Sequence, residues 1–162
     1  MGGRIFSILM KKNIFIIVFS CVLPSILTAR SVPAGMVAVK NDDVNMRSGP
    51  SLEKEVLWKL GIGFPLKVIK KTGDWLQVED FEGSTGWVHK DVVDRSGHMI
   101  VKAQKKTNGK INIRQEPDAG SRIVAKAYYG VVFETLEQRK GWVKVRQGEV
   151  TGWIKRSLLW GF

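Results

Sequence analysis

The side chains that could perform catalysis in this chain are few and are poorly spaced for it. Glu79, Asp80 and Glu82 could supply paired carboxylates for glycoside cleavage, but they crowd one predicted turn instead of flanking a cleft. His89 and His98 lie nine residues apart without cysteine partners, which is not the spacing of a metal site. No nucleophile elbow or histidine-bearing motif accompanies the serines. We therefore predict that the protein is not an enzyme, with no catalytic residue, no metal site and no cofactor.

Tryptophan is the more regular feature, because it recurs opposite the residues expected to be buried. If Leu76 and Val78 face a core, strand alternation places Trp75 on the other face. Alternation also places three further tryptophans on the outer face. Two of these tryptophans are followed, two positions later, by a lysine on the same face. Large rings on an outer face can stack on sugars or peptides. The candidate ligand-binding residues are therefore Trp75, Trp87, Trp142, Lys144, Trp153 and Lys155. The alternative is that these rings cap the ends of the fold or lie between its repeats.

The amino-terminal segment has the order of a secretory signal. Lys11 and Lys12 precede an apolar run over 14–27, which is broken at Pro24 and followed by Ala29, a residue that suits signal peptidase. The run is shorter than the roughly 20 apolar residues of a membrane-spanning helix. We predict a signal peptide at 1–29, a periplasmic or secreted mature protein and no membrane span after cleavage. An uncleaved membrane anchor is the alternative.

Charge is shared unevenly along the remaining chain. Residues 42–94 contain 7 basic and 10 acidic residues, whereas residues 95–162 contain 14 basic and 5 acidic ones. A basic surface attracts anions over about one Debye length, roughly 8 Å at physiological salt. Outside the cytoplasm such anions are wall-peptide carboxylates, lipid headgroups and acidic proteins, so nucleic acid is not the expected partner. A solvated basic face that aids solubility is the alternative interpretation.

An internal repeat organises the chain. Three motifs recur in the same order, the first two after 67 residues and the third after 66. The pairs are Val44–Pro50 with Ile111–Pro117, Trp75–Val78 with Trp142–Val145, and Gly86–Val88 with Gly152–Ile154. We conclude that the chain contains two copies of one unit, and that the second copy lacks one residue in a turn.

The elements that carry these motifs are predicted to be short strands. Apolar residues alternate within each copy, and Gly-containing turns separate the alternating segments. About five strands in some 55 residues can bury one common face only by curling into a barrel. Met36–Val39 and Met99–Val101 are expected to open the two barrels, which should sit close together. The predicted fold is all-β, with two consecutive small barrels at 36–95 and 98–162.

The motifs (Val/Ile)-Asn-x-Arg-x-x-Pro, Trp-x-x-Val and Gly-Trp-(Val/Ile) resemble those of bacterial SH3-like (SH3b) domains. The chain is also similar to small exported proteobacterial proteins that carry two such domains. This resemblance implies barrels of five or six strands that bind cell-wall glycan or peptide, or other proteins, without chemistry of their own. The second copy departs from the pattern, because Gln115-Glu116-Pro117 replaces the usual Ser-Gly-Pro turn.

These observations together predict a non-catalytic module of the cell envelope that recognises peptidoglycan or an envelope protein. Two other functions stay open at this point: a structural or assembly protein, and a regulatory subunit of a cell-wall hydrolase. Oligomeric state is not indicated by the sequence.

Overall fold

A computed structural model describes residues 35–103, 105 and 109–162, and the predicted signal peptide lies outside these residues. In the first copy the strands are β1 Met36–Val39, β2 Val44–Arg47, β3 Val56–Leu60, β4 Pro65–Thr72, β5 Trp75–Glu79, β6 Thr85–His89 and β7 Val93–Asp94. In the second they are β8 His98–Val101, β9 Ile111–Arg114, β10 Ile123–Ala127, β11 Val132–Arg139, β12 Trp142–Gln147, β13 Val150–Lys155 and β14 Leu159–Gly161. The helical segments of the described ranges are two 3-10 turns, η1 Lys90–Val92 and η2 Arg156–Leu158.

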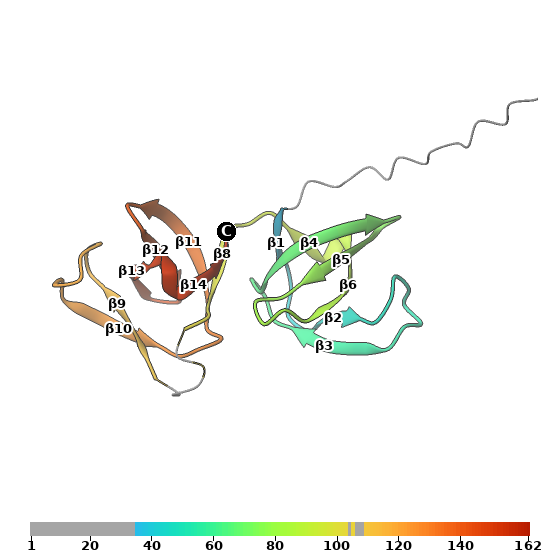
Figure 1. The fold of residues 1–162 in the computed structure, drawn as a ribbon, viewed down its shortest axis with the longest axis horizontal. Coiled ribbons are helices and arrows are strands. Elements are labelled where there is room, and N and C mark those ends of the chain that lie inside the picture. The colour runs from blue at the N-terminus through green and yellow to red at the C-terminus, as the bar shows by residue number, and fades with distance from the viewer. Residues whose placement is uncertain (1–34, 104, 106–108) are drawn as a thin grey trace, which may run out of the picture.

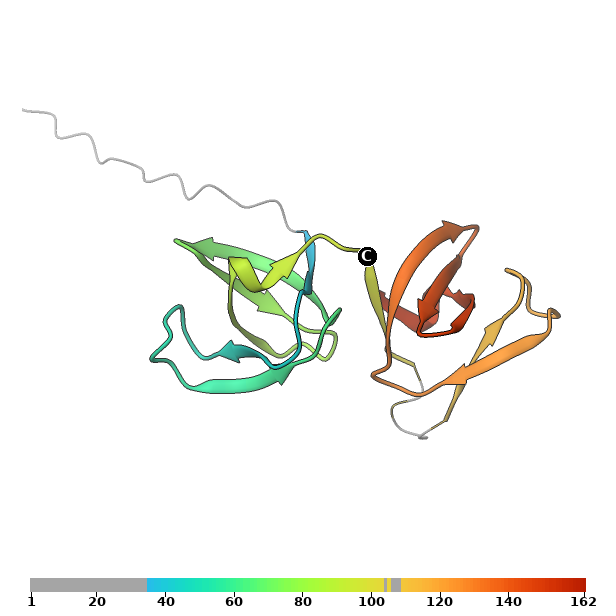
Figure 2. The ribbon, with the colours of Figure 1, turned by 180° about the vertical axis from the view of Figure 1, so that it is seen from behind.

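Each copy forms one curled antiparallel sheet, and Figures 1 and 2 show the two sheets as separate barrels side by side. The strand order is β3-β2-β6-β5-β4-β1-β7 in the first copy and the equivalent β10-β9-β13-β12-β11-β8-β14 in the second. The predicted all-β fold of two small barrels is confirmed, with β1 and β8 as their opening strands. Each sheet has seven strands, more than the five or so expected, because β7 and β14 are short and β3 and β10 are mostly exposed, so none of them shows a clear alternation.

Every barrel has its own apolar core, built by one face of its strands. In the first copy the core includes Met46, Leu66, Val78 and Val88, and in the second it includes Met99, Ile113, Val143, Val145, Ile154 and Leu159. The alternating residues of β2, β5 and β6 therefore point away from the core.

Glycine at the start of the Gly-Trp motif allows two strands to cross closely. A Cβ added to Gly86 of β6 would lie 2.6 Å from Cγ of Met46 and 3.1 Å from the carbonyl oxygen of Arg47. At the equivalent Gly152 of β13, a Cβ would lie 2.8 Å from the carbonyl oxygen of Arg114. A Cβ would therefore displace the Met46 side chain at Gly86 and the backbone at Gly152, so glycine allows β6 to pair closely with β2 and β13 with β9.

The two barrels are joined through β4, which contacts β8 and β14 of the second copy. Ile100 of β8 is completely buried but belongs to neither core, whereas Met99 and Val101 belong to the second core. Alternation therefore turns Ile100 outward from its own barrel, and its burial indicates that the junction covers it. None of the helices in the described residues has the length and apolar character needed to cross a membrane.

Candidate functional site

An equivalent hollow occurs in both copies, between β2, β6 and η1 in the first and between β9, β13 and η2 in the second. The hollow of the first copy has a volume of about 280 Å³, and its lining includes Asn45, Arg47, Trp75, His89 and Val92. In the second, of about 180 Å³, it is lined by Asn112, Arg114, Trp142, Lys155 and Leu158. These residues correspond one to one through the repeat shift of 67 or 66 residues. We call the two hollows the tryptophan grooves of the first and second copy.

The arginine of the repeated motif holds the loop that follows β2 or β9. Nη1 of Arg47 donates a hydrogen bond to the carbonyl oxygen of Lys54 at 2.7 Å, and Nη1 of Arg114 donates to that of Ser121 at 2.6 Å. In the first copy a second hollow over Pro50–Glu53 continues from Trp75 and His89 along this loop. The sequence analysis did not predict that this arginine holds the loop, although its presence at the same position in both copies indicated that it has a role.

Asn45 carries an unused acceptor at the first groove. Its side chain lines the hollow, and its buried Oδ1 has no hydrogen-bond partner within the described residues. Buried acceptors are normally paired, because an unpaired one costs the free energy of its lost hydration. A donor from a ligand or an ordered water would satisfy this oxygen.

Trp75 and Trp142 are half-buried, and each is the ring of its groove. The ring of Trp75 meets the imidazole of His89 edge to face, with centroids 5.4 Å apart. Nζ of Lys155 lies 5.7 Å from the centroid of the Trp142 ring. The structure therefore brings together two of the predicted residues, Trp142 and Lys155, in one groove.

Trp87 and Trp153 do not form part of an exposed stacking surface. Both point away from the cores as expected, but they expose only 9% and 5% of their surface. Nζ of Lys70 lies 5.4 Å from the centre of the Trp87 ring, and Nζ of Lys144 lies 5.9 Å from that of Trp153. Long side chains and neighbouring strands therefore cover these two candidate rings, and their predicted role in ligand binding stays a prediction.

The strand pairing of the second copy makes its candidate tryptophans and lysines neighbours. β12 and β13 run antiparallel, with Trp142 opposite Lys155 and Lys144 opposite Trp153. The four side chains therefore share one face of the sheet. Trp142 with Lys155 lines the groove, whereas Lys144 with Trp153 forms its covered flank.

The two grooves differ in charge. The residues lining the second groove include Arg114 and Lys155 and no acidic side chain. The first groove contains Arg47 but also Asp42 and Asp43. The uneven charge of the sequence is therefore present at the grooves themselves, and the second groove is the one suited to an anionic ligand.

The carboxylates considered for catalysis form ion pairs and hydrogen bonds with other residues of the chain. Glu79 pairs with Lys67 at 3.5 Å, and Oδ1 of Asp80 accepts hydrogen bonds from the backbone N–H groups of Glu82 and Ser84. Hydrogen bonds from Lys105 and Tyr129 hold the pKa of Glu82 below its ordinary value. Groups of three or more side chains able to hold a metal ion are absent from the part of the chain that the structure describes.

The family model described as "Bacterial SH3 domain" matches residues 40–94 and 107–161, so the chain belongs to the bacterial SH3 domain family. The chain is also 26% identical over 155 residues to the protein of Bacillus subtilis (strain 168) named "Putative N-acetylmuramoyl-L-alanine amidase YrvJ". That match covers 90% of this chain but only 30% of the relative, so most of the relative has no counterpart here.

Two solved structures share parts of the fold at low similarity. NlpC2 from Trichomonas vaginalis is 13% identical with a TM-score of 0.35, over 80% of this chain and 48% of that one. The structure titled "Endolysin LysPBC5 CBD" is 18% identical with a TM-score of 0.32, over 80% of this chain and 96% of that one. At such values neither likeness carries an argument about function.

Proposed function

We propose that this chain is a non-catalytic binding module of the bacterial cell envelope, which recognises peptidoglycan through its tryptophan grooves. The observation that carries the proposal is the recurrence of one groove, with the same Asn, Arg and Trp residues, in both copies. Membership of the bacterial SH3 domain family supports it. The name of the Bacillus subtilis relative, which refers to an amide bond of the cell wall, supports the choice of ligand.

The groove chemistry fits a polymer of sugars and short peptides. The half-buried ring of Trp75 or Trp142 offers an apolar face on which a sugar or peptide can stack. Beside Trp142, the side chains of Arg114 and Lys155 offer donors and positive charge to a peptide carboxylate. The loop held by the motif arginine keeps one edge of each groove in place, which lowers the entropy lost on binding.

The proposal includes location outside the cytoplasm, with removal of residues 1–29 and barrels at 36–95 and 98–162. The charged and then apolar order of the amino-terminal residues supports export. Amino-terminal sequencing of the protein from fractionated cells should give a start near Arg30 in the periplasmic or secreted fraction. Full-length protein in the cytosol would contradict export and would make nucleic acid a candidate partner again.

Retention on purified sacculi tests the ligand. The chain from Arg30 to Phe162 should sediment with sacculi, and the double variant Trp75→Ala, Trp142→Ala should remain in the supernatant. Tyr128→Ala is the matched control, because this aromatic ring is 45% exposed and lines neither groove. Wild-type protein in the supernatant, together with a co-purifying envelope protein, would instead favour the assembly function.

A further inference from the structure

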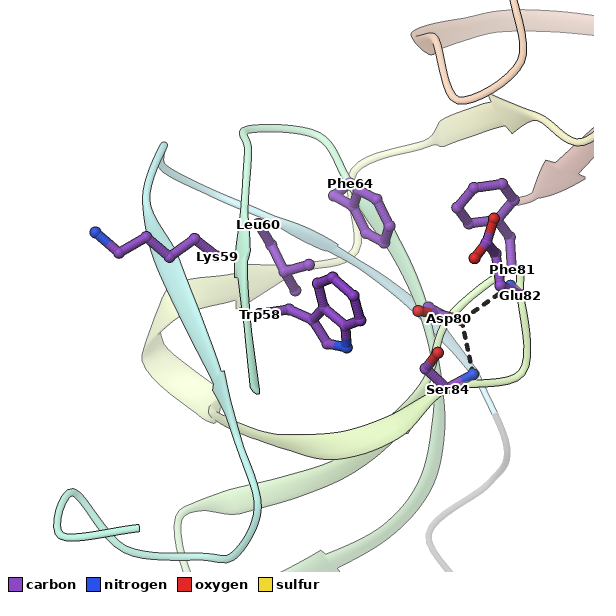
Figure 3. A pocket seen from close by; sticks show the side chains of 8 residues that line it. All are labelled: Trp58, Lys59, Leu60, Phe64, Asp80, Phe81, Glu82 and Ser84. Atoms are coloured by element: carbon purple, nitrogen blue, oxygen red, sulfur yellow. Dashed lines mark hydrogen bonds between the residues drawn. The ribbon is translucent and has the colours of Figure 1, made fainter. Parts of the chain in front are cut away.

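A second kind of pocket lies in the first copy, away from the tryptophan groove and beside the junction. It encloses about 200 Å³ between β3 and the turn that joins β5 to β6. Figure 3 shows the rings of Trp58, Phe64 and Phe81 around this space. Trp58 is 57% exposed although it is large and apolar, and Phe64 and Phe81 meet edge to face at 5.9 Å. Exposed aromatic rings gathered at a hollow are typical of a binding surface.

The pocket combines these rings with negative charge. Asp80 and Glu82 line it, and the only basic side chain in its lining, Lys59, points away from the rings in Figure 3. Oδ1 of Asp80 accepts the backbone N–H groups of Glu82 at 2.8 Å and of Ser84 at 2.9 Å. The second carboxylate oxygen of Asp80 takes part in neither of these two bonds.

The second barrel holds the wall of the pocket in place. The ring of Phe81 packs on that of Tyr129, with centroids 5.2 Å apart. Glu82 accepts hydrogen bonds from the hydroxyl of Tyr129 and, at 2.7 Å, from Nζ of Lys105. The turn is thus positioned by the other copy before any ligand binds, which favours affinity.

The second copy does not repeat the residues that line this pocket. At the shift of 67 residues, Ala125, Val131 and Gln147 stand where the first copy has Trp58, Phe64 and Asp80. The β12–β13 turn has residues 148–149, three fewer than residues 80–84 of the β5–β6 turn. The aromatic rings and the carboxylate of Asp80 are therefore specific to the first copy, and the common fold does not require them.

We propose that this pocket binds a primary ammonium group carried on an aliphatic stem, as in a lysine side chain. A cation over an aromatic face is attracted by the quadrupole of the ring, and the carboxylate of Asp80 adds a charge-assisted hydrogen bond. The aliphatic stem would lie against Leu60 and the phenylalanine rings. This pocket is a separate site, and its existence does not depend on peptidoglycan binding by the tryptophan grooves.

The test uses Nα-acetyl-L-lysine methylamide as the probe and the 15N-labelled chain from Arg30 to Phe162. Indole N–H resonances of the six tryptophans report where the probe binds. Saturable shifts should occur at the resonance assigned to Trp58. Nα-acetyl-L-norleucine methylamide, which has the same stem without the charge, should bind about two- to fivefold more weakly, the size expected for a cation over a partly exposed ring.

Two variants probe opposite walls of the pocket. Asp80→Asn retains an oxygen for the turn hydrogen bonds but removes the charge, and Trp58→Ala removes an exposed ring, so both should stay folded. Each should weaken lysine-probe binding by about fivefold, while Trp75→Ala should leave it unchanged. Equal affinity for the two probes, or wild-type affinity in both variants, would overturn the proposal. Loss of sacculus binding with intact probe binding would refute only the peptidoglycan proposal.

Discussion

Among the predicted site residues, Trp142 is the one whose substitution best distinguishes a loss of ligand binding from a loss of stability. Its ring is half-buried, lines the second groove and belongs to neither core. Trp142→Ala should therefore stay folded. Trp153→Ala is the informative comparison, because that ring is only 5% exposed. Its truncation should lower the free energy of unfolding by about 3 to 5 kcal/mol, a large share of the stability of a small domain.

The expected loss of binding follows from the contacts of the ring. Stacking on an aromatic face contributes about 0.5 to 1.5 kcal/mol beyond its buried area, which corresponds to roughly a 2- to 12-fold change in affinity. Nζ of Lys155, 5.7 Å from the ring centre, also loses its aromatic partner. We therefore expect Trp142→Ala to bind sacculi roughly tenfold more weakly than wild type.

The assay is sedimentation with sacculi at low and high salt, with urea unfolding curves for each variant. Because stacking is not screened by ions, Trp142→Ala should lose a similar factor at both salt concentrations. A Trp142→Ala protein that unfolds would show that the ring is structural. A folded variant that binds as tightly as wild type would refute the second groove as the site.

Three further predictions concern Lys155, Gly152 and Tyr129. Lys155→Gln should weaken sacculus binding mainly at low salt, since exposed charges are screened at high salt; an equal loss at high salt would contradict a purely electrostatic role. Gly152→Ala should lower the unfolding free energy in urea by about 1 to 3 kcal/mol, because its Cβ would lie 2.8 Å from a backbone oxygen. Gly97→Ala, whose Cβ would make ordinary contacts from 3.5 Å, is the control. Tyr129→Phe should lower the unfolding free energy at neutral pH, and this difference should shrink in acid. The depressed pKa of Glu82 means that its stabilising contribution is present above the ordinary glutamate pKa and is lost as pH falls through the folded value. A pH-independent difference would contradict the role of its carboxylate.

Much of the fold and part of the site were predictable from local pattern. Alternation gave the inward residues such as Val78 and Val143, and the repeat shift paired Trp75 with Trp142. Alternation is a short-range property with period two, and the repeat is a direct comparison of two segments of the sequence, so neither requires knowledge of contacts in the fold. The neighbouring positions of Trp142 and Lys155 also followed, because a short turn joins β12 to β13.

The rest of the site depended on contacts between segments that are distant in the sequence. Trp87 and Trp153 have the same outward phase as the groove rings, but their burial depends on side chains from other strands, such as Lys70. The pocket at Trp58 requires β3 to face a turn more than twenty residues later, which is in turn held by Tyr129 of the other copy. No periodicity within one strand carries that information.

Comparison of the two grooves shows which residues set their shape and which set their chemistry. Asn, Arg, Gly and Trp are the same in both copies, and the arginine bonds to the equivalent backbone oxygen in each. The variable position in the grooves carries charge, because His89 corresponds to Lys155. Outside the grooves, the Lys67–Glu79 pair corresponds to Glu134–Arg146 with its signs reversed. The ring contact of Phe81 with Tyr129 and the burial of Ile100 link the two barrels. A polymer that occupied both grooves would gain affinity from the second contact without any new interaction, and each groove could favour a differently charged segment of it.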